Sequence, residues 1–230
     1  MTLKILSWNI LQGGGTRIND IIKSLIETNA TIIGISEFKN NNGGHALRYS
    51  LLRAGWIHQS TGHNNAENNT VFIASKIPFE LQLPASGLNE YQDQIIKACF
   101  PAFEFYQCYF PHKKEHHLFQ TLFNELKKEK TAIIMGDLNT GKNLLDQVAH
   151  SFWYAKEFMN LDQHNCVDAF RFLHGDVQEF SWYSHNKQGY RYDHCFISNE
   201  IKPILKSCYY LHQYREQGLS DHSPMILELS

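Results

Sequence analysis

Short runs of consecutive apolar residues alternate along the chain with stretches in which apolar residues recur every three or four positions. The runs predict strands that are covered on both faces, at residues 3–10, 31–36, 70–74 and 131–135. The three- and four-residue spacing predicts amphipathic helices, at residues 18–26, 46–54 and 118–130, with shorter helical patches at 143–149 and 151–160. Further strands are predicted at residues 94–98, 103–110, 180–183, 191–198, 204–211 and 225–229.

This order of elements predicts an α/β protein with mixed sheets, because strands alternate with helices and are then followed by adjacent strands. The chain has 230 residues, of which 43% are hydrophobic and 13% aromatic, enough to bury a full core. We find no Pro- or Ser-rich linker in the sequence. We therefore expect residues 1–230 to form one domain.

Charge and cysteine content narrow the function classes only a little. The formal net charge is −2 and the isoelectric point about 6.7, which neither supports nor excludes DNA as a partner, because a local basic groove is compatible with such a mean. The five cysteines include no Cys-x-x-Cys pair, which argues against a disulfide framework or a zinc ribbon. The N-terminus lacks a signal-peptide pattern and the chain lacks an 18-residue apolar run, so a cytoplasmic location is expected.

Polar residues follow the ends of several predicted strands. These residues are Asn9, Glu37, Asp137 with Asn139, Asp193 with His194, and Asp221 with His222. In α/β sheets ligands bind where strands end, so we expect one convergent site. Buried carboxylates need partners, and oxygen ligands of this kind suit Mg²⁺ or Mn²⁺. A zinc site at His112, His116 and His117 is disfavoured, because no acidic or thiol ligand flanks this Lys-rich segment.

The motifs resemble the endonuclease/exonuclease/phosphatase superfamily, with the exonuclease III-like branch the nearest. The resemblance runs from residue 3 to residue 229 and rests on Ser7-Trp8-Asn9-Ile10, Ser36-Glu37-Phe38-Lys39, Tyr109-Phe110-Pro111, Gly136-Asp137-Leu138-Asn139, Phe180-Ser181-Trp182, Arg191-Tyr192-Asp193 and Ser220-Asp221-His222. Each motif is weak by itself, whereas all of them in order are a strong signal. The resemblance implies a four-layer α/β/β/α sandwich of two packed sheets, with outer helices and a metal site at one edge.

The resemblance also implies a role for each motif residue. Glu37 would bind Mg²⁺ or Mn²⁺ with Asn9 beside it, and Asp221 could reach the same metal or a second one. Asp137 would orient or deprotonate the attacking water, and Asn139 would hold that water or the phosphate. The remaining roles fall to Tyr109, as a hydrogen-bond donor to a phosphate oxygen, and to His222, as a charge-stabilising group oriented by Asp193.

Substrate contacts are expected from Tyr190, Arg191, Tyr192 and His112. The two tyrosines could stack on a base or a flipped sugar, or they could simply pack on the sheet. Trp182 is expected to be a core residue. His112 stands where the family commonly has Asn or Gln, and it could take part in catalysis.

The chain departs from the exonuclease III-like pattern at other places too. The family usually has Asn or Asp two places after the first Asn, where this chain has Leu11 followed by Gln12-Gly13-Gly14-Gly15. The segment between Trp182 and Arg191 is short, and the whole chain is compact. Such loops select the substrate, so the hydrolytic core is predicted more firmly than the substrate.

Three functions remain open from the sequence. The first is a divalent-metal-dependent DNA phosphodiesterase, either an exonuclease or an abasic-site endonuclease. The second is a phosphatase or phosphodiesterase for a small or lipid-derived phosphate, towards which the weakly acidic balance leans. The third is a binding module without turnover, which the set Glu37, Asp137, Asn139 and His222 argues against.

Overall fold

Two mixed β-sheets make up most of the protein. The computed structural model describes residues 2–84, 91–126, 130–148 and 151–230. The first sheet has the strand order β13 (Leu205–Tyr210), β14 (Met225–Leu229), β1 (Leu3–Asn9), β2 (Ile32–Phe38), β4 (Thr70–Ser75) and β3 (His58–Thr61). The second has the order β5 (Glu80–Gln82), β6 (Ile95–Cys99), β7 (Glu104–Tyr109), β8 (Ala132–Asp137), β12 (Asp193–Ser198) and β9 (Cys166–Asp168). Only β1–β2 and β7–β8 pair in parallel among these described strands.

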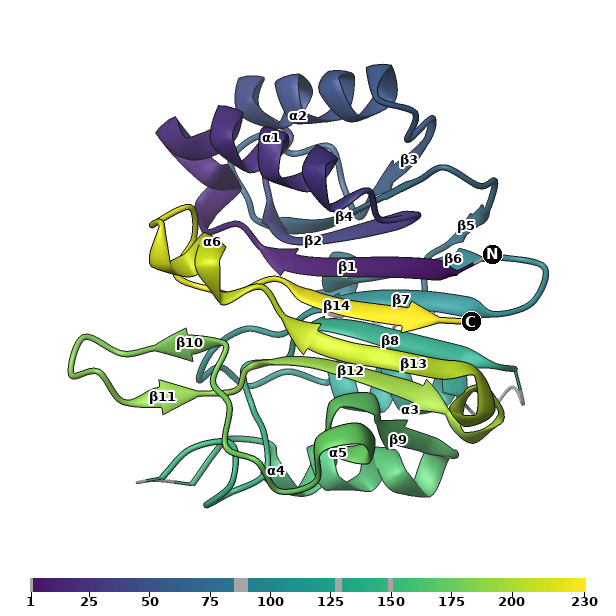
Figure 1. Ribbon diagram of the computed structural model, residues 1–230, viewed down its shortest axis with the longest axis vertical. Coiled ribbons are helices and arrows are strands. Elements are labelled where there is room, and N and C mark those ends of the chain that lie inside the picture. The colour runs from purple at the N-terminus through teal and green to yellow at the C-terminus, as the bar shows by residue number, and fades with distance from the viewer. Residues whose placement is uncertain (1, 85–90, 127–129, 149–150) are drawn as a thin grey trace.

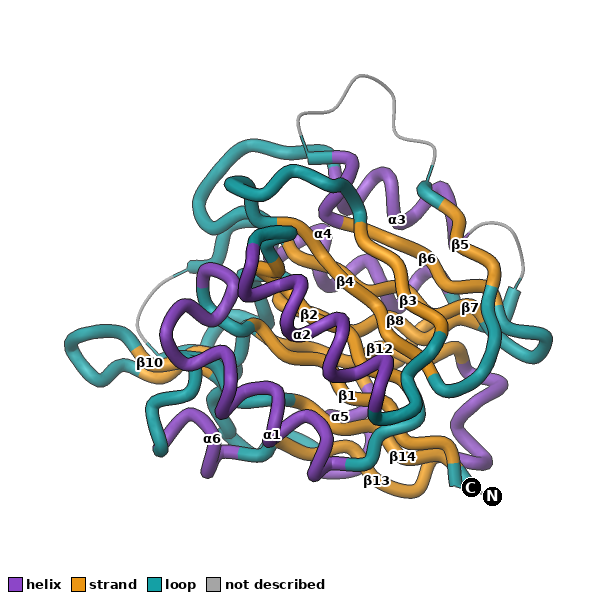
Figure 2. The backbone as a smooth tube through the Cα atoms, turned by 90° about the horizontal axis from the view of Figure 1, so that it is seen from above, coloured by secondary structure: helices purple, strands orange, loops and turns teal. Residues whose placement is uncertain are grey.

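Helices cover the outer faces of the two sheets. The helices are α1 (Ile18–Thr28), α2 (Asn42–Arg53), α3 (Leu118–Leu126), α4 (Ala155–Met159), α5 (Ala169–His174) and α6 (His212–Glu216). In Figure 1 α1 and α2 lie above the first sheet and α3 and α4 lie below the second, whereas α5 packs beside β12 and β13 and adds Ala169 and Phe170 to the cluster between the sheets. Figure 2 shows α1 and α2 running side by side over the first sheet. The predicted four-layer α/β/β/α sandwich with two mixed sheets is confirmed.

Three hydrophobic clusters hold these layers together. Apolar side chains of both sheets interdigitate between them, among them Ile5, Ile133 and Cys195. A second cluster joins the first sheet to α1 and α2, and a third joins the second sheet to α3 and α4. Burial of these apolar faces supplies the main driving force for folding.

The alternation of side chains along a strand carries the inter-sheet face to one edge of the sandwich. On β1, Leu3 and Ile5 face the second sheet, whereas Leu6 and Trp8 face the helices. Asn9 has the same parity as Leu3 and Ile5, so it projects between the sheets where β1 ends. Asp137 on β8 continues the inward row of Ile133 and Met135 in the same way.

Several local predictions need correction. Residues 143–148 form turns where a helical patch was expected, and residues 149 and 150 lie outside the described ranges. The patch at 151–160 contains only the short helix α4, and the expected helix at 118–130 is described as far as Leu126. The strand at 180–183 is reduced to β10 (Trp182–Tyr183), which pairs with β11 (Gly189–Tyr190) in a hairpin.

Strand pairing, and not disulfide bonds, holds the two ends of the described chain together. Leu3 of β1 pairs with Leu229 of β14, so the two ends lie side by side (Figure 1). All five cysteines are free, and each lies in a strand. Among the described residues we find no helix with the length and apolar character that a membrane span requires.

Candidate active site

The expected polar residues converge at the edge of the sandwich where β1, β2, β7 and β8 end. This is the edge from which the β10–β11 hairpin projects in Figure 1. The Asn9 side-chain nitrogen, Nδ2, donates to Glu37 Oε1 at 3.1 Å and to Asp137 Oδ2 at 2.9 Å. One amide therefore links the ends of both sheets. Asn9, Glu37 and Asp137 are exposed by 1%, 8% and 1%, so these contacts are screened little by water.

Backbone irregularity aims Glu37 at this edge. The register between β2 and β4 shifts between Ile35 and Phe38, so Glu37 occupies the position of an inserted residue in a β-bulge. Its φ is 55°, which is uncommon for a residue with a side chain. Without the bulge, Glu37 would continue the outward row of Ile33 and Ile35 under the helices. The bulge turns the carboxylate towards Asn9.

Neutral donors surround the Glu37 carboxylate. Its Oε2 accepts hydrogen bonds from the Gln12 backbone N at 2.9 Å, from Gln12 Nε2 at 3.1 Å and from Asn69 Nδ2 at 3.1 Å. The Tyr109 hydroxyl also contacts this group; its pKa lies well above the usual range because of burial and the nearby Glu37 and Asp137 charges. Tyr109 therefore keeps its proton and can donate it in a hydrogen bond.

Asp137 and Asn139 come from the turn after β8. Asn139 has a φ of 47°, and its backbone N donates to Asp137 Oδ1 at 2.9 Å. Its Nδ2 donates to the Phe110 carbonyl at 2.8 Å and to Asp137 Oδ2 at 3.2 Å. Gly136, just before this turn, allows β7 and β8 to approach closely, because a Cβ there would lie 1.9 Å from the Cys108 carbonyl oxygen. The Gly-Asp-x-Asn motif therefore meets a conformational requirement at the end of β8.

His222 and Asp193 form a buried pair beside Asp137. His222 Nδ1 lies 2.7 Å from Asp193 Oδ2, and its Nε2 lies 3.8 Å from Asp137 Oδ2. The Trp8 indole donates to the His222 carbonyl at 2.9 Å and the Ser220 hydroxyl donates to the Asn9 carbonyl at 2.6 Å, which fixes the last motif against β1.

The charges of this group are strongly coupled. Burial by itself disfavours the imidazolium, yet the Asp193 and Asp137 carboxylates raise the pKa of His222 to about 10. Burial raises the pKa of Asp137 to about 8, with Asp193 adding to the shift and His222 opposing it. His222 is therefore a cation at neutral pH, with N–H groups directed at both carboxylates.

The donor set fits a divalent cation. In the described part of the chain Glu37 forms no salt bridge with Lys or Arg, and His222 is the one cationic partner of Asp137 and Asp193. Ligand atoms of Asp137, Asp193 and His222 lie within 4.8 Å of one another. Three carboxylates with one imidazolium leave excess negative charge on hard oxygen atoms, the environment that Mg²⁺ or Mn²⁺ prefers.

Two expected metal neighbours have other contacts as well. Asn9 directs its nitrogen at the two carboxylates, while its oxygen accepts the Leu11 N–H at 2.9 Å. Asp221 Oδ2 accepts the Trp182 indole N–H at 2.8 Å.

Two pockets flank the centre. One of about 240 Å³ has an aromatic wall that includes Trp182, Tyr190, Tyr192 and Phe152. The Tyr190 and Tyr192 rings stack with their centroids 5.2 Å apart. Trp182 is half-buried in this wall, so the expectation of a core residue is wrong. The short hairpin decides this, because Trp182 pairs with Tyr190 at the base of the hairpin, outside the layers of the sandwich.

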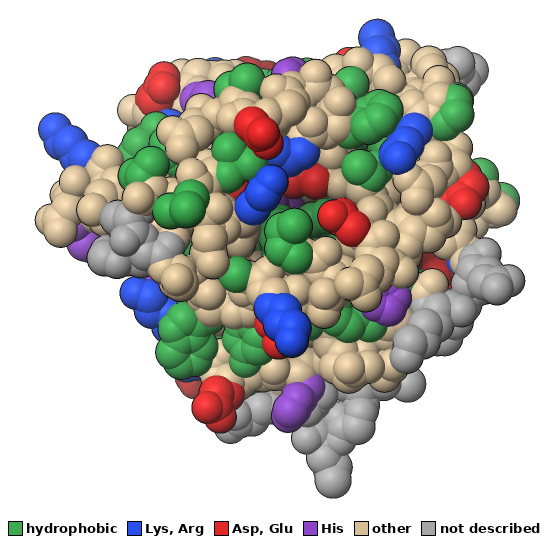
Figure 3. Space-filling model, turned by 90° about the horizontal axis from the view of Figure 1, so that it is seen from below, with side chains coloured by type: hydrophobic (Ala, Val, Ile, Leu, Met, Phe, Trp, Pro, Cys, Tyr) green, Lys and Arg blue, Asp and Glu red, His purple; other side chains and the backbone are tan. Residues whose placement is uncertain are grey.

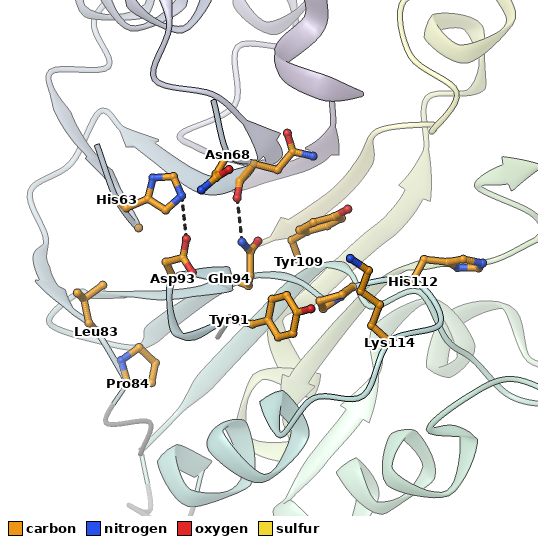
Figure 4. Close-up of a pocket in the computed structure, with 13 residues that line it drawn as sticks. His63, Asn68, Leu83, Pro84, Tyr91, Asp93, Gln94, Tyr109, His112 and Lys114 are labelled. Carbon is orange, nitrogen blue, oxygen red and sulfur yellow. Dashed lines mark hydrogen bonds and ion pairs between the residues drawn. The ribbon is translucent and has the colours of Figure 1, made fainter. Parts of the chain in front are cut away.

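The other pocket, of about 800 Å³, lies beside Tyr109 (Figure 4). An ion pair joins His63 Nε2 and Asp93 Oδ2 at 2.9 Å, and Gln94 donates to the Asn69 carbonyl at 2.9 Å. These two contacts tie the loop that carries Asn69 to the second sheet.

His112 separates the two pockets. It lines both of them, and its Nδ1 lies 3.0 Å from Asn139 Oδ1. Burial lowers the pKa of His112, so the ring is neutral at pH 7. Since the Asn139 oxygen can only accept, the nitrogen that faces it carries the proton.

Arg191 does not join the site, and the expectation that it contacts substrate must be corrected. It is 1% exposed, with Nε 2.7 Å from Asp146 Oδ1 and Nη2 2.5 Å from Asp168 Oδ2. Arg171 is a further partner of Asp146. A substrate cannot reach a guanidinium that is buried between two carboxylates. Neighbours on a strand point to opposite faces, so Arg191 turns inward where Tyr190 turns to the pocket.

Sequence reasoning missed Gln12 and Asn69. Both lie in segments that read as ordinary loops, one Gly-rich and the other Asn-rich. Side-chain amides at those places were the available signal, but only the folded chain shows that they meet at Glu37.

Comparison with known proteins settles the family. Residues 6–222 match the Endonuclease/Exonuclease/phosphatase family. The chain belongs to this family. It is 25% identical to an exodeoxyribonuclease of Streptococcus pneumoniae, over 99% of each chain. That alignment runs over 277 positions, so the relative has segments for which this family member has no residues.

Solved structures agree on the fold. The 3′ phosphatase NExo (D146N) from Neisseria, bound to product DNA hairpin, superposes with a TM-score of 0.84 at 20% identity, over 99% of each chain. An AP endonuclease from Archaeoglobus fulgidus gives 0.83 at 20% identity, over 98% of each chain. The predicted family and its phosphoester-hydrolase class are confirmed, with relatives of the predicted exonuclease and abasic-endonuclease kinds.

Proposed function

We propose that this protein is a divalent-metal-dependent DNA phosphodiesterase that acts as an exonuclease or an abasic-site endonuclease. The observation that carries the proposal is the convergence of Glu37, Asn9, Asp137 and the Asp193–His222 pair at one edge, beside an aromatic pocket. Its relatives in Streptococcus and Neisseria are described as an exodeoxyribonuclease and as a DNA-bound 3′ phosphatase.

We place the metal, Mg²⁺ or Mn²⁺, beside Glu37 rather than at the three ligand atoms of Asp137, Asp193 and His222. His222 Nδ1 and Asp193 Oδ2 already contact each other directly at 2.7 Å, which leaves no space for an ion between them. The Glu37 carboxylate, in contrast, has only neutral hydrogen-bond donors around it among the described residues, so its charge remains available to a cation. A metal at this place would polarise the phosphoryl oxygens and neutralise their charge.

The remaining residues then have distinct tasks. Asp137 in its ionised form takes the proton of the attacking water, which Asn139 holds by its amide. Tyr109 donates a hydrogen bond to a phosphate oxygen. His222, oriented by Asp193, stabilises the charge that develops on the phosphoryl group.

We place the nucleoside next to the scissile phosphate in the aromatic pocket, between His112 and the Tyr190–Tyr192 stack. An aromatic wall next to a phosphate-binding centre suits a base or a sugar, because both faces of a base are apolar. On the face below α4 and α5, Lys and Arg side chains stand among Asp and Glu side chains (Figure 3). Because both signs of charge are mixed there, this face attracts the phosphates of DNA less than a basic surface would. We therefore place the DNA at the edge with the site.

A substrate panel tests the proposal. The purified protein is incubated with Mg²⁺ and abasic duplex, blunt duplex, single-stranded DNA, and inositol and sphingolipid phosphodiesters, with Asp137→Asn as the inactive control. We expect cleavage of DNA that falls steeply with salt, because phosphate contacts release counterions. Cleavage of only the inositol or sphingolipid esters, or equal cleavage by Asp137→Asn, would overturn the proposal.

A further inference from the structure

The turn after β1 has an unusual backbone that presents one side chain to Glu37. Leu11, Gln12, Gly13, Gly14 and Gly15 all have positive φ, between 51° and 78°. Left-handed backbone is costly for residues with a Cβ, so Leu11 and Gln12 hold this conformation only because their surroundings impose it. Strain of this kind concentrates at functional sites.

Identifiable contacts impose this conformation. The Leu11 N–H is bound by Asn9 Oδ1, and the Arg17 guanidinium donates to the Leu11 carbonyl at 2.9 Å. The glycines let the chain turn back into α1: a Cβ on Gly14 would lie 2.9 Å from Ile21 Cδ1. The turn therefore places Gln12 in a fixed position over the Glu37 carboxylate.

Gln12 meets Glu37 twice, through its backbone and its side chain. The Gln12 backbone N and Nε2 both donate to Glu37 Oε2, at 2.9 and 3.1 Å. The backbone contact fixes the distance between the residues, and the side chain is free to change its own contact because Gln12 is exposed. Rotation of the amide about its last bond exchanges the nitrogen with the oxygen, which have nearly the same position and size.

That exchange would create a pair of metal ligands with suitable spacing. An octahedral Mg²⁺ site holds its oxygens at about 2.0–2.1 Å, so two adjacent ligands lie roughly 3 Å apart. The tip of Gln12 is 3.1 Å from Glu37 Oε2. At position 11 the chain has a Leu, whose side chain has no oxygen to offer.

We propose that Gln12 is a metal-binding residue of this enzyme, its side-chain oxygen turning to the divalent cation beside Glu37. The inference rests on the proposed function, because it assumes the cation that the proposed reaction uses. Asn69 provides the contrast: its amide donates to the same Glu37 oxygen at 3.1 Å, but no strained turn holds it there. We assign Asn69 the role of a positioning donor only.

Calorimetric titration with Mn²⁺, without DNA, tests this assignment. We expect Gln12→Ala to weaken Mn²⁺ binding by roughly 10- to 100-fold, the loss usual for groups that support a metal. Gln12→Glu keeps an oxygen at the same place, so it should bind Mn²⁺ at least as tightly as the wild type. The control is Gln120→Ala on α3, whose exposed amide donates to Asn124 Oδ1 at 2.9 Å, and it should leave the affinity unchanged.

Two outcomes overturn the assignment. One is Mn²⁺ binding by Gln12→Ala within about twofold of the wild type; the other is an equal loss in Gln12→Ala and Asn69→Ala, which would make both amides simple donors. A crystal structure with Mn²⁺ gives a direct reading, since the anomalous peak must lie within about 2.3 Å of the Gln12 oxygen.

The same proteins separate this inference from the proposed function. If the wild type binds Mn²⁺ through Gln12 but cleaves no DNA, the proposed function fails and the assignment stands. If the wild type cleaves DNA while Gln12→Ala binds Mn²⁺ normally, the assignment fails and the proposed function stands. A wild type that binds no Mn²⁺ overturns both.

Discussion

Two buried polar clusters lie near each other in this protein, and their charge balance differs. Around Arg191, the carboxylates of Asp146 and Asp168 face two guanidinium groups, those of Arg191 and Arg171. Around His222, three carboxylates face one imidazolium and a set of neutral amides. In the first cluster the positive and negative charges balance, and their contacts hold the fold together. The second cluster has an excess of negative charge. This excess can be neutralised by a bound cation, and its ionisable groups can take part in proton transfer.

Removal of a charge from the second cluster should therefore change activity far more than stability. We expect Asp137→Asn and His222→Ala to slow DNA cleavage by roughly 10²- to 10⁴-fold, the range for a lost acid–base group. The free energy of unfolding of Asp137→Asn should stay equal or rise, because the variant relieves repulsion with Asp193. Single-turnover cleavage and urea unfolding measure the two quantities. A stability loss as large as that of an Arg191 variant would erase the distinction between the clusters.

The opposite result is expected for Arg191→Met. Loss of the guanidinium leaves two carboxylates in a buried place, so the free energy of unfolding should fall by about 3–5 kcal/mol. Urea unfolding checks this, with the exposed Arg53→Met as the matched control. If the stability is unchanged and the KM for DNA is raised, Arg191 binds substrate, as the sequence predicted, and the structural role assigned to it is wrong.

Tyr190 lies next to Arg191 in the sequence, but its ring lines the pocket. The two neighbours therefore differ in role, one structural and the other facing the substrate. We expect Tyr190→Ala to weaken DNA binding by about 1–3 kcal/mol, the value for one base stacked on an aromatic ring. Stability should change little, since Tyr190 is half-buried at the end of a hairpin. Fluorescence anisotropy with single-stranded DNA provides the measurement, and Tyr49→Ala on α2 serves as an exposed aromatic control. Equal affinities of the wild type and Tyr190→Ala for DNA would contradict the placement of the nucleoside in this pocket.

The smallest effect concerns acid stability. Burial alone would raise the pKa of Asp168 and of Asp146, but Arg191 outweighs it and lowers both. A carboxyl whose folded pKa is depressed stabilises the protein above its unfolded value, near pH 4, and that stabilisation is lost as the pH falls through the folded pKa. We therefore expect the free energy of unfolding to decline from about pH 4 downward, with a shallower decline in Asp168→Asn. Identical pH profiles for the two proteins would contradict this assignment.

The sequence determined most of the strands, the family and the polar residues that meet at one edge. Continuous apolar runs predict strands that are buried on both faces, and the polar residues that end them mark one edge of the sheets. Local motifs were enough to name the residues that converge there, which are Asn9, Glu37, Asp137, Asn139, Asp193 and His222.

The tertiary structure decided what surrounds those residues. The bulge at Glu37, the left-handed turn at Gln12 and the inward direction of Arg191 depend on pairing between strands that are distant in sequence. Sequence patterns record whether a residue is polar, but the face to which it points depends on register, and one inserted residue reverses it. For this reason the predicted positions of Arg191 and Trp182 were wrong. The contact between Gln12 and Glu37 could likewise be recognised only in the folded chain, where β1 and β2 lie side by side.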